Sequence, residues 1–484
     1  MNMAKPDSTA SGATSALSEI KLSSIVGRVG EGVQIDGTLL RLTRHLVVFE
    51  IYSPDFTLRV SAVLDDCKIV ISDRMLYAGR AVVRSLVNAG LKLICEATLN
   101  EESWTGVEFT PGVTDRVKLG NEFKKFIHEW QKFYLVSAEY KVAVADLQTF
   151  LSDLRLLLEQ MELKIASSPV SDRVVMERDI VLGLGESVIP AIDHLFDQFE
   201  EASDKIEEEL RPAHRAFGRR QLHPLLLCAP FMRRTYTKPL GYAGDYEMMN
   251  MIVSHELEGN SLFAKLANAY LLDQVAPRAV RNRVGFLYDK MVDEASRVAR
   301  CGRTANIYSI ACGPAREAQN FVAEQPLSDQ AHFLLLDFNE ETLQYVGNRM
   351  EELKKEHHRR TSIKLVKNSV HKLLKGPSKR APEEPGYDLI YCSGLYDYLS
   401  DAVIKKLNTY FYDQLLPSGL LVVGNFAPCT PRQNLMEHLS EWFLIYRDAQ
   451  KLATLAPEQA SKENCVVRAE PTGANIFLEI RKPK

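Results

Sequence analysis

The stretch NIYSIACGPAREAQNFVAEQPLSDQAHFLLLD, residues 306–337, carries the clearest fold signal in this 484-residue sequence. It opens with an apolar run of strand length, 307–311, which leads into a turn of small residues at 312–315. The next residues have helical spacing, and a second apolar run, 333–336, ends on Asp337. Strand, tight turn, helix, strand and acid are the layout of a nucleotide-binding βαβ unit. In such a unit the helix N-terminus faces the ligand, and the acid binds the ribose hydroxyls.

The turn holds one glycine, Gly313, with Ala311 and Ala315 at alternate positions. This differs from the Gly-x-Gly-x-x-Gly pattern that brings a pyrophosphate onto a helix end in dinucleotide-binding proteins. It resembles the first motif of class I methyltransferases that use S-adenosyl-L-methionine (SAM), acid-x-Gly-x-Gly-x-Gly. Alanine replaces the first and third glycines, and Ser309 stands at the acidic position. The resemblance implies SAM as the cofactor, with Asp337 at its ribose.

Composition places the chain among ordinary globular proteins. Charged residues are 25%, hydrophobic residues are 46% and the net charge is −4, so nothing favours nucleic acid as the main partner. No apolar run approaches the ~20 residues that cross a bilayer, so no transmembrane segment is expected. The eight cysteines are scattered without a Cys-x-x-Cys pair. This pattern predicts reduced thiols, a cytoplasmic location and no structural zinc site.

The length allows about two to four domains. The polar residues 1–20 are expected to be a disordered leader. Between residues 21 and 115, short apolar runs alternate with turn signals, which predicts a small β-barrel or sandwich. Six strands are expected, at 32–35, 46–51, 58–64, 68–71, 78–84 and 91–97.

The run MLYAGRAVVRSLVNAGLKLICEATL within this region resembles a PilZ-like barrel, a fold often used to bind cyclic-di-GMP. Binding in that family depends on an Arg-x-x-x-Arg arm and an Asp/Asn-x-Ser-x-x-Gly strand motif. Neither is present, because Arg41 and Arg44 have the wrong spacing. A degenerate PilZ-like module for interaction or dimerisation is therefore favoured over a nucleotide sensor.

Residues 116–168 carry apolar side chains at helical spacing without proline. This predicts one long helix or two stacked helices that link the domains or pair the subunits, so that a homodimer could form through this helix or the N-terminal module. A helical cap and lid are expected over 169–300.

The segment FMRRTYTKPLGYAGDYEMMNM, 231–251, stands out within that cap. Its two glycines and its proline predict a shaped loop. Its tyrosines supply apolar faces with hydroxyl groups, and Arg233, Arg234 and Lys238 supply cations for a carboxylate or phosphate. The loop is expected either to pack on the surface or to form a lid over the nucleotide site.

The sequence Lys-Pro-x-Gly-Tyr-Ala-Gly-Asp-Tyr-Glu in this loop, followed by Cys-Gly-Pro-Ala-Arg-Glu at 312–317, gives a narrower resemblance. It is similar to the branch of class I methyltransferases that makes 3-hydroxy fatty acid methyl esters. These esters are bacterial quorum signals, of which 3-hydroxypalmitic acid methyl ester is the best known. The resemblance covers roughly residues 185–484 and implies an O-methyltransferase that acts on a carboxylate, either a small molecule or an acyl chain.

Residues 301–484 are expected to form a Rossmann-like, seven-stranded methyltransferase domain. Apolar runs at 363–366, 387–392 and 420–426 predict further strands. The last run, 475–481, suits the antiparallel seventh strand of this fold, which dinucleotide dehydrogenases lack. Ligands bind at the carboxyl ends of the strands in such sheets. The expected cofactor-binding residues are Ala311, Gly313, Ala315, Asp337, Asn339, Asn368, Ser369 and Ser393.

Methyl transfer to a carboxylate is an in-line displacement that needs no strong base, because the acceptor is already an anion. The sequence shows no Ser/His/Asp set, metal cluster or obvious base. The candidates near the acceptor, assigned as catalytic, are Tyr242, Asp245, Tyr396 and Arg233. Two alternatives stay open: another small-molecule methyltransferase, and a non-catalytic regulator that binds SAM or a cyclic dinucleotide.

Overall fold

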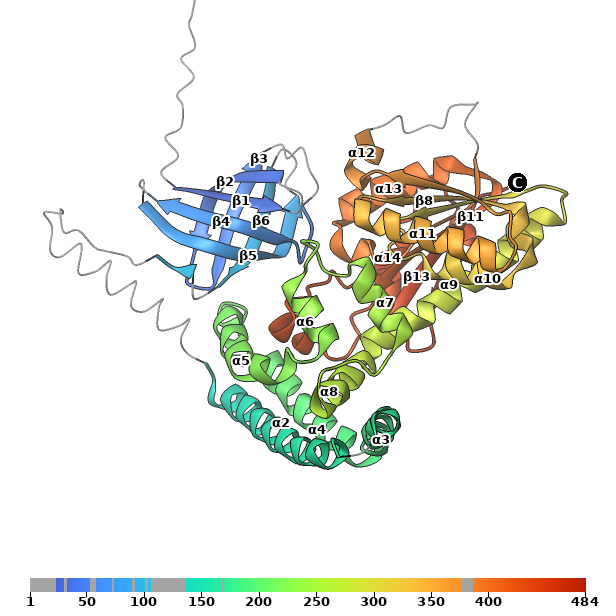
Figure 1. Cartoon of the computed structure of the whole chain (residues 1–484). Coiled ribbons are helices and arrows are strands. Elements are labelled where there is room, and N and C mark those ends of the chain that lie inside the picture. The colour runs from blue at the N-terminus through green and yellow to red at the C-terminus, as the bar shows by residue number, and fades with distance from the viewer. Residues whose placement is uncertain are drawn as a thin grey trace, which may run out of the picture.

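The computed structural model describes residues 23–29, 33–52, 58–71, 74–88, 92–100, 103–105, 136–167, 169–375 and 386–484. These residues form a blue β-barrel, a layer of helices and a sheet covered by helices on both faces (Figure 1). The expected leader, and residues 116–135 of the expected helical segment, lie outside the described residues.

The N-terminal part is a closed barrel with the strand order β1-β2-β3-β6-β5-β4. Its strands are β1 (Ser23–Val29), β2 (Val33–Leu42), β3 (Leu46–Tyr52), β4 (Val63–Ile71), β5 (Arg74–Asn88) and β6 (Lys92–Leu99). Phe49, Cys67, Ile69 and Tyr77 are among the buried side chains that fill its interior. The prediction of a small β-barrel is confirmed, whereas its PilZ-like character stays a prediction.

Two strand predictions in the barrel were wrong. No strand was expected at β1, and most of the strand expected at 58–64 is a loop. Ser61 in this loop has a φ of 63°, a left-handed backbone that an extended strand does not allow. Its hydroxyl donates to the carbonyl of Phe443 at 3.1 Å and accepts from the amide of Phe443 at 2.6 Å. Contacts with a segment almost four hundred residues away therefore override the local strand pattern.

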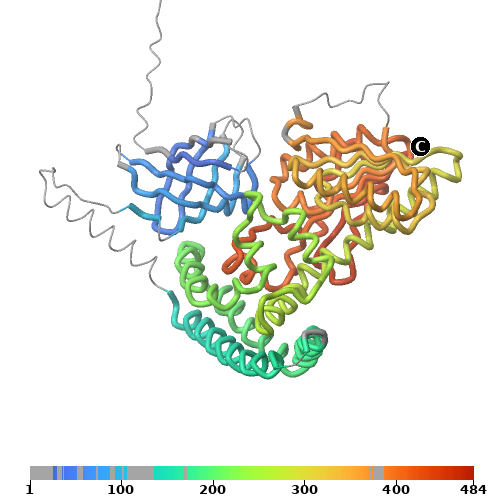
Figure 2. Tube along the Cα trace, in the orientation of Figure 1, coloured from blue at the N-terminus to red at the C-terminus, as the bar shows by residue number. Residues whose placement is uncertain are grey.

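The helical layer lies below the barrel and the sheet in the view of Figures 1 and 2. Its helices are α2 (Ala138–Ile165), α3 (Val170–Gly183), α4 (Gly185–Asp204), α5 (Arg211–Leu226), α6 (Pro230–Thr237), α7 (Tyr246–Ser254), α8 (Leu262–Leu272) and α9 (Val275–Ala299). The apolar residues of α2 pack in the same core as those of α4, α5 and α8. Pairing of subunits through α2 stays a prediction.

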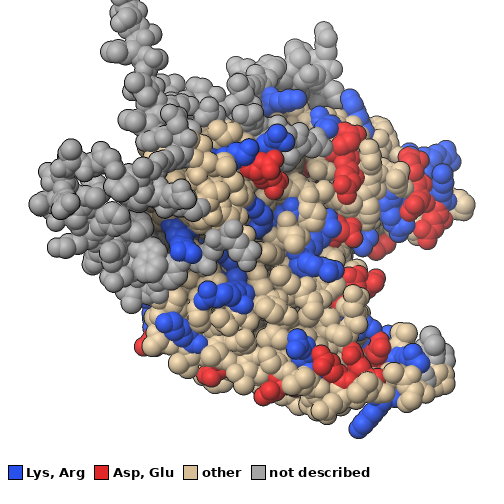
Figure 3. Space-filling model, turned by 60° about the vertical axis from the view of Figure 1, so that its left-hand side comes forward, with Lys and Arg blue, Asp and Glu red and all other residues tan. Residues whose placement is uncertain are grey.

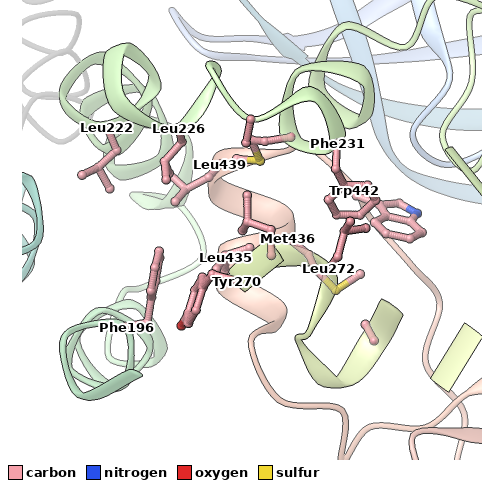
Figure 4. Packing of buried hydrophobic residues seen from close by; sticks show 14 of the residues in the cluster. Phe196, Leu222, Leu226, Phe231, Tyr270, Leu272, Leu435, Met436, Leu439 and Trp442 are labelled. Atoms are coloured by element: carbon pink, nitrogen blue, oxygen red, sulfur yellow. The ribbon is translucent and has the colours of Figure 1, made fainter. Parts of the chain in front are cut away.

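A segment from the C-terminal part completes the core of this layer. It includes the short helical turn η4 (Leu435–Leu439). Leu439 faces Leu222 of α5, and Leu435 lies beside Phe196 and Tyr270, whose rings stack at 5.5 Å (Figure 4). The helical layer and the C-terminal part therefore share one hydrophobic core.

The C-terminal sheet has seven strands in the order β12-β13-β11-β10-β7-β8-β9. They are β7 (Ala305–Ile310), β8 (Ala331–Asp337), β9 (Ser362–Lys367), β10 (Tyr387–Cys392), β11 (Leu415–Phe426), β12 (Cys465–Ala469) and β13 (Asn475–Arg481). Strands β7 to β11 are parallel, and β13 is antiparallel to β11 and β12. This confirms the Rossmann-like sheet with an antiparallel C-terminal strand. The strand order reverses between β7 and β10, which creates a crevice at their carboxyl ends.

Helices cover both faces of this sheet. One face packs on α9, α10 (Arg316–Glu324) and α11 (Glu340–Glu356). The other packs on α12 (Val370–Lys375), α13 (Asp401–Gln414) and α14 (Ala449–Ala453). No helix among the described residues combines the length and apolarity needed to cross a bilayer. On the face shown in Figure 3, Lys and Arg side chains are interspersed with Asp and Glu side chains.

A buried ion cluster joins the three parts. Glu441, which follows η4, accepts hydrogen bonds from Arg80 of β5 at 3.3 Å, Arg219 of α5 at 2.9 Å and Thr98 of β6 at 3.4 Å. Lys238, next to the same carboxylate, donates to the carbonyl of Ser440 at 3.1 Å. Burial favours the neutral form of Glu441, but Arg219, Arg80 and Lys238 outweigh it, so the pKa of Glu441 is lowered. The barrel is thus tied to both other parts by charge.

We expect Glu441→Gln to destabilise the protein by about 3–5 kcal/mol, because the variant leaves the buried Lys238 and the partly buried Arg80 and Arg219 without a counter-charge. Asp66→Asn is the matched control, since Asp66 pairs with Arg28 at 3.6 Å on the barrel surface, where both side chains are mostly exposed. That control should change stability by less than about 1 kcal/mol. Urea unfolding measures both, and equal effects of the two substitutions would contradict the assigned role of Glu441.

Candidate active site

A pocket lies at the reversal point of the sheet, where the topology predicts a ligand site. Its walls come from the turn after β7, the ends of β8 and β10, the loop between α6 and α7, helix α9 and the barrel. The residues that line it include Arg59, Tyr242, Gly244, Arg283, Ala311, Gly313, Glu317, Asp337, Phe338, Tyr391, Ser393, Asp397, Tyr398 and Trp442.

The turn after β7 has an unusual backbone. Ala311, Gly313 and Ala315 all have a φ of 51°, in the left-handed region. This conformation costs a non-glycine residue roughly 1–2 kcal/mol. Alanine nevertheless holds it at two of the three positions, so conformational freedom alone does not account for the glycine at 313. A Cβ built on Gly313 would meet no atom within 4 Å. Gly313 therefore leaves open space along the pocket wall.

Asp337, at the end of β8, holds this turn in place. One carboxylate oxygen accepts from the amide of Gly313 at 3.1 Å, and the other accepts from the amide of Asn339 at 3.0 Å. The side chain is only 5% exposed. Burial raises its pKa, against the opposing effects of the two amides and of the nearby guanidinium of Arg59. The carboxylate is thus both a structural clamp and a pocket wall.

The segment after β10 supplies Asp397 and Tyr398. One oxygen of Asp397 accepts from the amide of Phe426 at 2.7 Å. Burial raises the pKa of Asp397 to about 6, although the amide of Phe426 and the guanidinium of Arg283 favour the charged form. The hydroxyl of Tyr398 accepts from the indole N–H of Trp442 at 2.8 Å. These contacts fix two polar side chains beside the pocket.

The loop between α6 and α7, expected to be either a lid or a surface loop, contributes Tyr242, Ala243 and Gly244 to the lining of the pocket. Tyr242 packs edge-on against Phe338, with ring centroids 5.0 Å apart. Gly244 has a φ of 74°, and a Cβ there would lie 3.1 Å from the hydroxyl of Tyr398. The lid therefore fits closely onto the segment after β10.

Three of the four residues assigned as catalytic, Arg233, Asp245 and Tyr396, lie outside the pocket lining. Arg233 is exposed on α6. Asp245 begins α7, where it accepts from the amide of Met248 at 2.8 Å and from Arg234 at 2.9 Å. The hydroxyl of Tyr396 donates to Asn408 of α13 at 2.6 Å, among the buried residues on the other face of the sheet. Tyr242 is the one of the four that lines the pocket.

The expected cofactor residues divide in a similar way. Ala311, Gly313, Asp337 and Ser393 line the pocket. The other four stabilise the backbone around the pocket. Ala315 precedes α10, and Asn339 caps α11 by accepting from the amide of Thr342 at 2.9 Å. The amide of Asn368 donates to the carbonyl of Asp337 at 3.0 Å, and Ser369 accepts from the amide of Lys372 at 3.3 Å.

Sequence reasoning missed several lining residues because they come from distant elements. Arg59 lay in an expected strand of the barrel, and Arg283 lay in the middle of an unremarkable helix. Glu317 of α10 accepts from the hydroxyl of Tyr391 at 2.9 Å. Its position one turn after Gly313 was the available signal. Within the described part of the chain, no group of three or more His, Cys, Asp or Glu side chains could hold a metal ion.

Comparisons with known proteins give fold similarity only. No protein-family model matches the sequence, and no curated protein matches it significantly. A solved structure described as a possible exported protein from Bordetella parapertussis is 18% identical, with 52% of this chain and 86% of that chain covered and a TM-score of 0.38. Magnesium protoporphyrin IX methyltransferase from Synechocystis PCC 6803, with bound S-adenosylhomocysteine, is 11% identical, with 43% and 87% covered and a TM-score of 0.30.

A third similar structure is the N-methyltransferase NodS from Bradyrhizobium japonicum WM9. It is 13% identical, with 41% of this chain and 98% of that chain covered and a TM-score of 0.27. At such low identities and scores, the reaction has to be inferred from the pocket itself.

The raised pKa of Asp397 predicts a pH-dependent stability. Its pKa is about 6 in the folded protein against 3.8 ordinarily, so folding favours the protonated form. The resulting stabilisation is present below about pH 4 and is lost as the pH rises through 6. Asp397→Asn keeps an acceptor for the amide of Phe426 and lacks this titration. The unfolding free energy of Asp397→Asn relative to the parent protein should therefore rise by roughly 2 kcal/mol between pH 4 and pH 7. A difference that does not change with pH in urea unfolding would contradict the assignment.

Proposed function

We propose that this chain is a SAM-dependent O-methyltransferase that methylates a carboxylate, and that the acceptor is a 3-hydroxy fatty acid whose methyl ester serves as a quorum signal. The observation that carries the proposal is the open turn at Gly313 beside the buried carboxylate of Asp337, at the reversal point of the sheet. The acceptor class, a 3-hydroxy fatty acid, is proposed because the sequence motifs in the lid and in the turn after β7 resemble those of the methyltransferases that make 3-hydroxy fatty acid methyl esters.

Two observations fit SAM to this pocket. The space beside Gly313 leaves the backbone uncovered, as a closely approaching ligand requires. Each oxygen of Asp337 accepts one backbone hydrogen bond and retains a lone pair that can accept from a ribose hydroxyl. We assign Ala311, Gly313, Asp337 and Ser393 to the donor. When bound, SAM supplies an electrophilic methyl group on its sulfonium.

The chain's own task is then to orient the acceptor and exclude water. A carboxylate needs no general base, and orientation of the reactants alone can lower the activation barrier by roughly 7–11 kcal/mol. Tyr242 and Gly244 of the lid lie over the pocket, and the close fit of Gly244 on Tyr398 helps to seal it. Water exclusion strengthens every electrostatic contact inside the pocket.

Part of the pocket wall suits an acyl chain. Met249 and Val253 of α7, Val280 and Val284 of α9, and Leu444 are among its lining residues. Burying one methylene against such a wall is worth about 0.8 kcal/mol. The apolar wall therefore favours a fatty acid over a small polar acid as the acceptor.

The direct test is transfer of a labelled methyl group from SAM to 3-hydroxy fatty acids, with the product identified by mass spectrometry. We expect a labelled methyl ester, with efficiency that increases with chain length. Methylation at a different group would establish another small-molecule methyltransferase. Calorimetry that shows binding of cyclic-di-GMP and no binding of S-adenosylhomocysteine would overturn the enzyme in favour of a regulator.

Gly313→Val should weaken the binding of S-adenosylhomocysteine at least tenfold, because the side chain would occupy the space left for the donor. The matched control is Gly302→Val in the turn after α9. Gly302 also has a positive φ, 67°, and open space around its Cβ position, but it lies outside the pocket. Both variants carry a similar backbone strain, so only Gly313→Val should lose binding in calorimetry. Equal affinities for the two variants would remove Gly313 from the donor site.

A further inference from the structure

The barrel extends one cation into the pocket. Arg59 belongs to the loop between β3 and β4, and its guanidinium lies 4.3 Å from the ring centroid of Phe338, the residue that follows Asp337. The pocket is therefore built from the barrel as well as from the C-terminal sheet. In Figure 2 the barrel abuts the green segment that contains the lid.

Residues 58–63, which include Arg59, are held firmly. Ser61 exchanges two hydrogen bonds with the backbone of Phe443, and the amide of Val63 donates to the carbonyl of Gly241 in the lid at 3.1 Å. Leu58 is buried in the core of the barrel, whereas Val60 is buried in the core of the helical layer. These contacts on both sides of Arg59 fix the position from which its side chain enters the pocket.

The guanidinium of Arg59 keeps its donors for a ligand. Among the residues that the structure describes, none accepts a hydrogen bond from it or forms an ion pair with it. The ring of Phe338 covers one face of the guanidinium, and stacking of this kind leaves the N–H groups at the edge unused. A cation in a largely enclosed site is costly unless it is paired. An anionic ligand would provide the missing partner.

The other cations near the pocket are already engaged. Arg234 pairs with Asp245 at 2.9 Å, and Lys238 belongs to the Glu441 cluster. The charges of Asp397 and Glu317 act on Arg283, which donates to the sulfur of Met249 at 3.3 Å. Arg316, which also lines the pocket, donates to the side-chain oxygen of Gln319 at 3.1 Å. The charge of Asp337 also acts on Arg59, but the two carboxylate oxygens of Asp337 already accept from backbone amides. Arg59 is thus the cation best placed to receive a carboxylate from outside.

We infer that Arg59 binds the carboxylate of the methyl acceptor, so that the barrel and the C-terminal domain together form the acceptor site. This inference rests on the proposed function and assigns the barrel a role in it. The planar fork of arginine can donate two parallel hydrogen bonds to a carboxylate, which would orient one oxygen toward the donor. A neutral ester or amide offers no such charge-assisted pair, so Arg59 makes the site selective for free acids.

The test uses the full chain and the variants Arg59→Ala and Arg59→Lys. Arg28→Ala is the control, because it removes an exposed arginine of the same barrel. With 3-hydroxypalmitic acid as the probe, Arg59→Ala should lower kcat/KM about 100-fold, mainly through KM. Arg59→Lys should recover part of the loss, since it restores the charge without the bidentate fork. The affinity for S-adenosylhomocysteine should change less than about threefold, and Arg28→Ala should behave as the parent protein.

A second measurement separates recognition from a structural role. In the presence of S-adenosylhomocysteine, the parent protein should bind the fatty acid at least tenfold more tightly than the amide of the same chain length, and Arg59→Ala should lose this preference. The inference would be overturned if a folded Arg59→Ala variant kept both its preference for the acid over the amide and the KM of the parent protein. It would also be overturned if the variant lost affinity for S-adenosylhomocysteine and not for the fatty acid. If the parent protein itself methylates no acid, the proposed function fails, whatever the variants do.

Discussion

The pocket depends on the two hydrogen bonds that the carboxylate of Asp337 accepts from the amides of Gly313 and Asn339. They join the turn after β7 to the end of β8 and the start of α11, beside the reversal point of the sheet. The turn needs this support because three of its residues adopt left-handed backbone angles, two of them without the freedom of glycine. One buried side chain therefore holds a strained turn open and also forms part of the ligand wall.

The second constraint is the docking of the barrel. Hydrogen bonds from Ser61 to Phe443 and from Val63 to Gly241 connect the barrel to the C-terminal part and to the lid. The ion cluster around Glu441 connects it to the helical layer. An independent sensor domain joined by a flexible tether would not need so many buried polar contacts. The absence of the cyclic-di-GMP motifs from the barrel sequence agrees with this arrangement, because the barrel here contributes a side chain to the pocket.

The sequence predicted what local patterns encode. The βαβ unit at 306–337, the parallel strands after it and the antiparallel strand β13 all follow from apolar runs and turns. The errors arose where distant parts meet. The loop around Arg59 has a strand-like composition, and only its contacts with Phe443 reveal its conformation. Tyr396 lies one residue before Asp397 yet points to the other face of the sheet, which no linear motif specifies.

The shared core of the helical layer has a consequence for biosynthesis. Helices α4, α5 and α8 emerge from the ribosome well before the turn at Leu435–Leu439 that covers Phe196, Leu222 and Tyr270. Until that late segment is translated, these apolar faces lack their final neighbours, and newly made chains with uncovered apolar surface are prone to aggregate. The helical layer thus completes its folding only after residues 435–439 have been translated, and shielding by chaperones is most valuable during that interval.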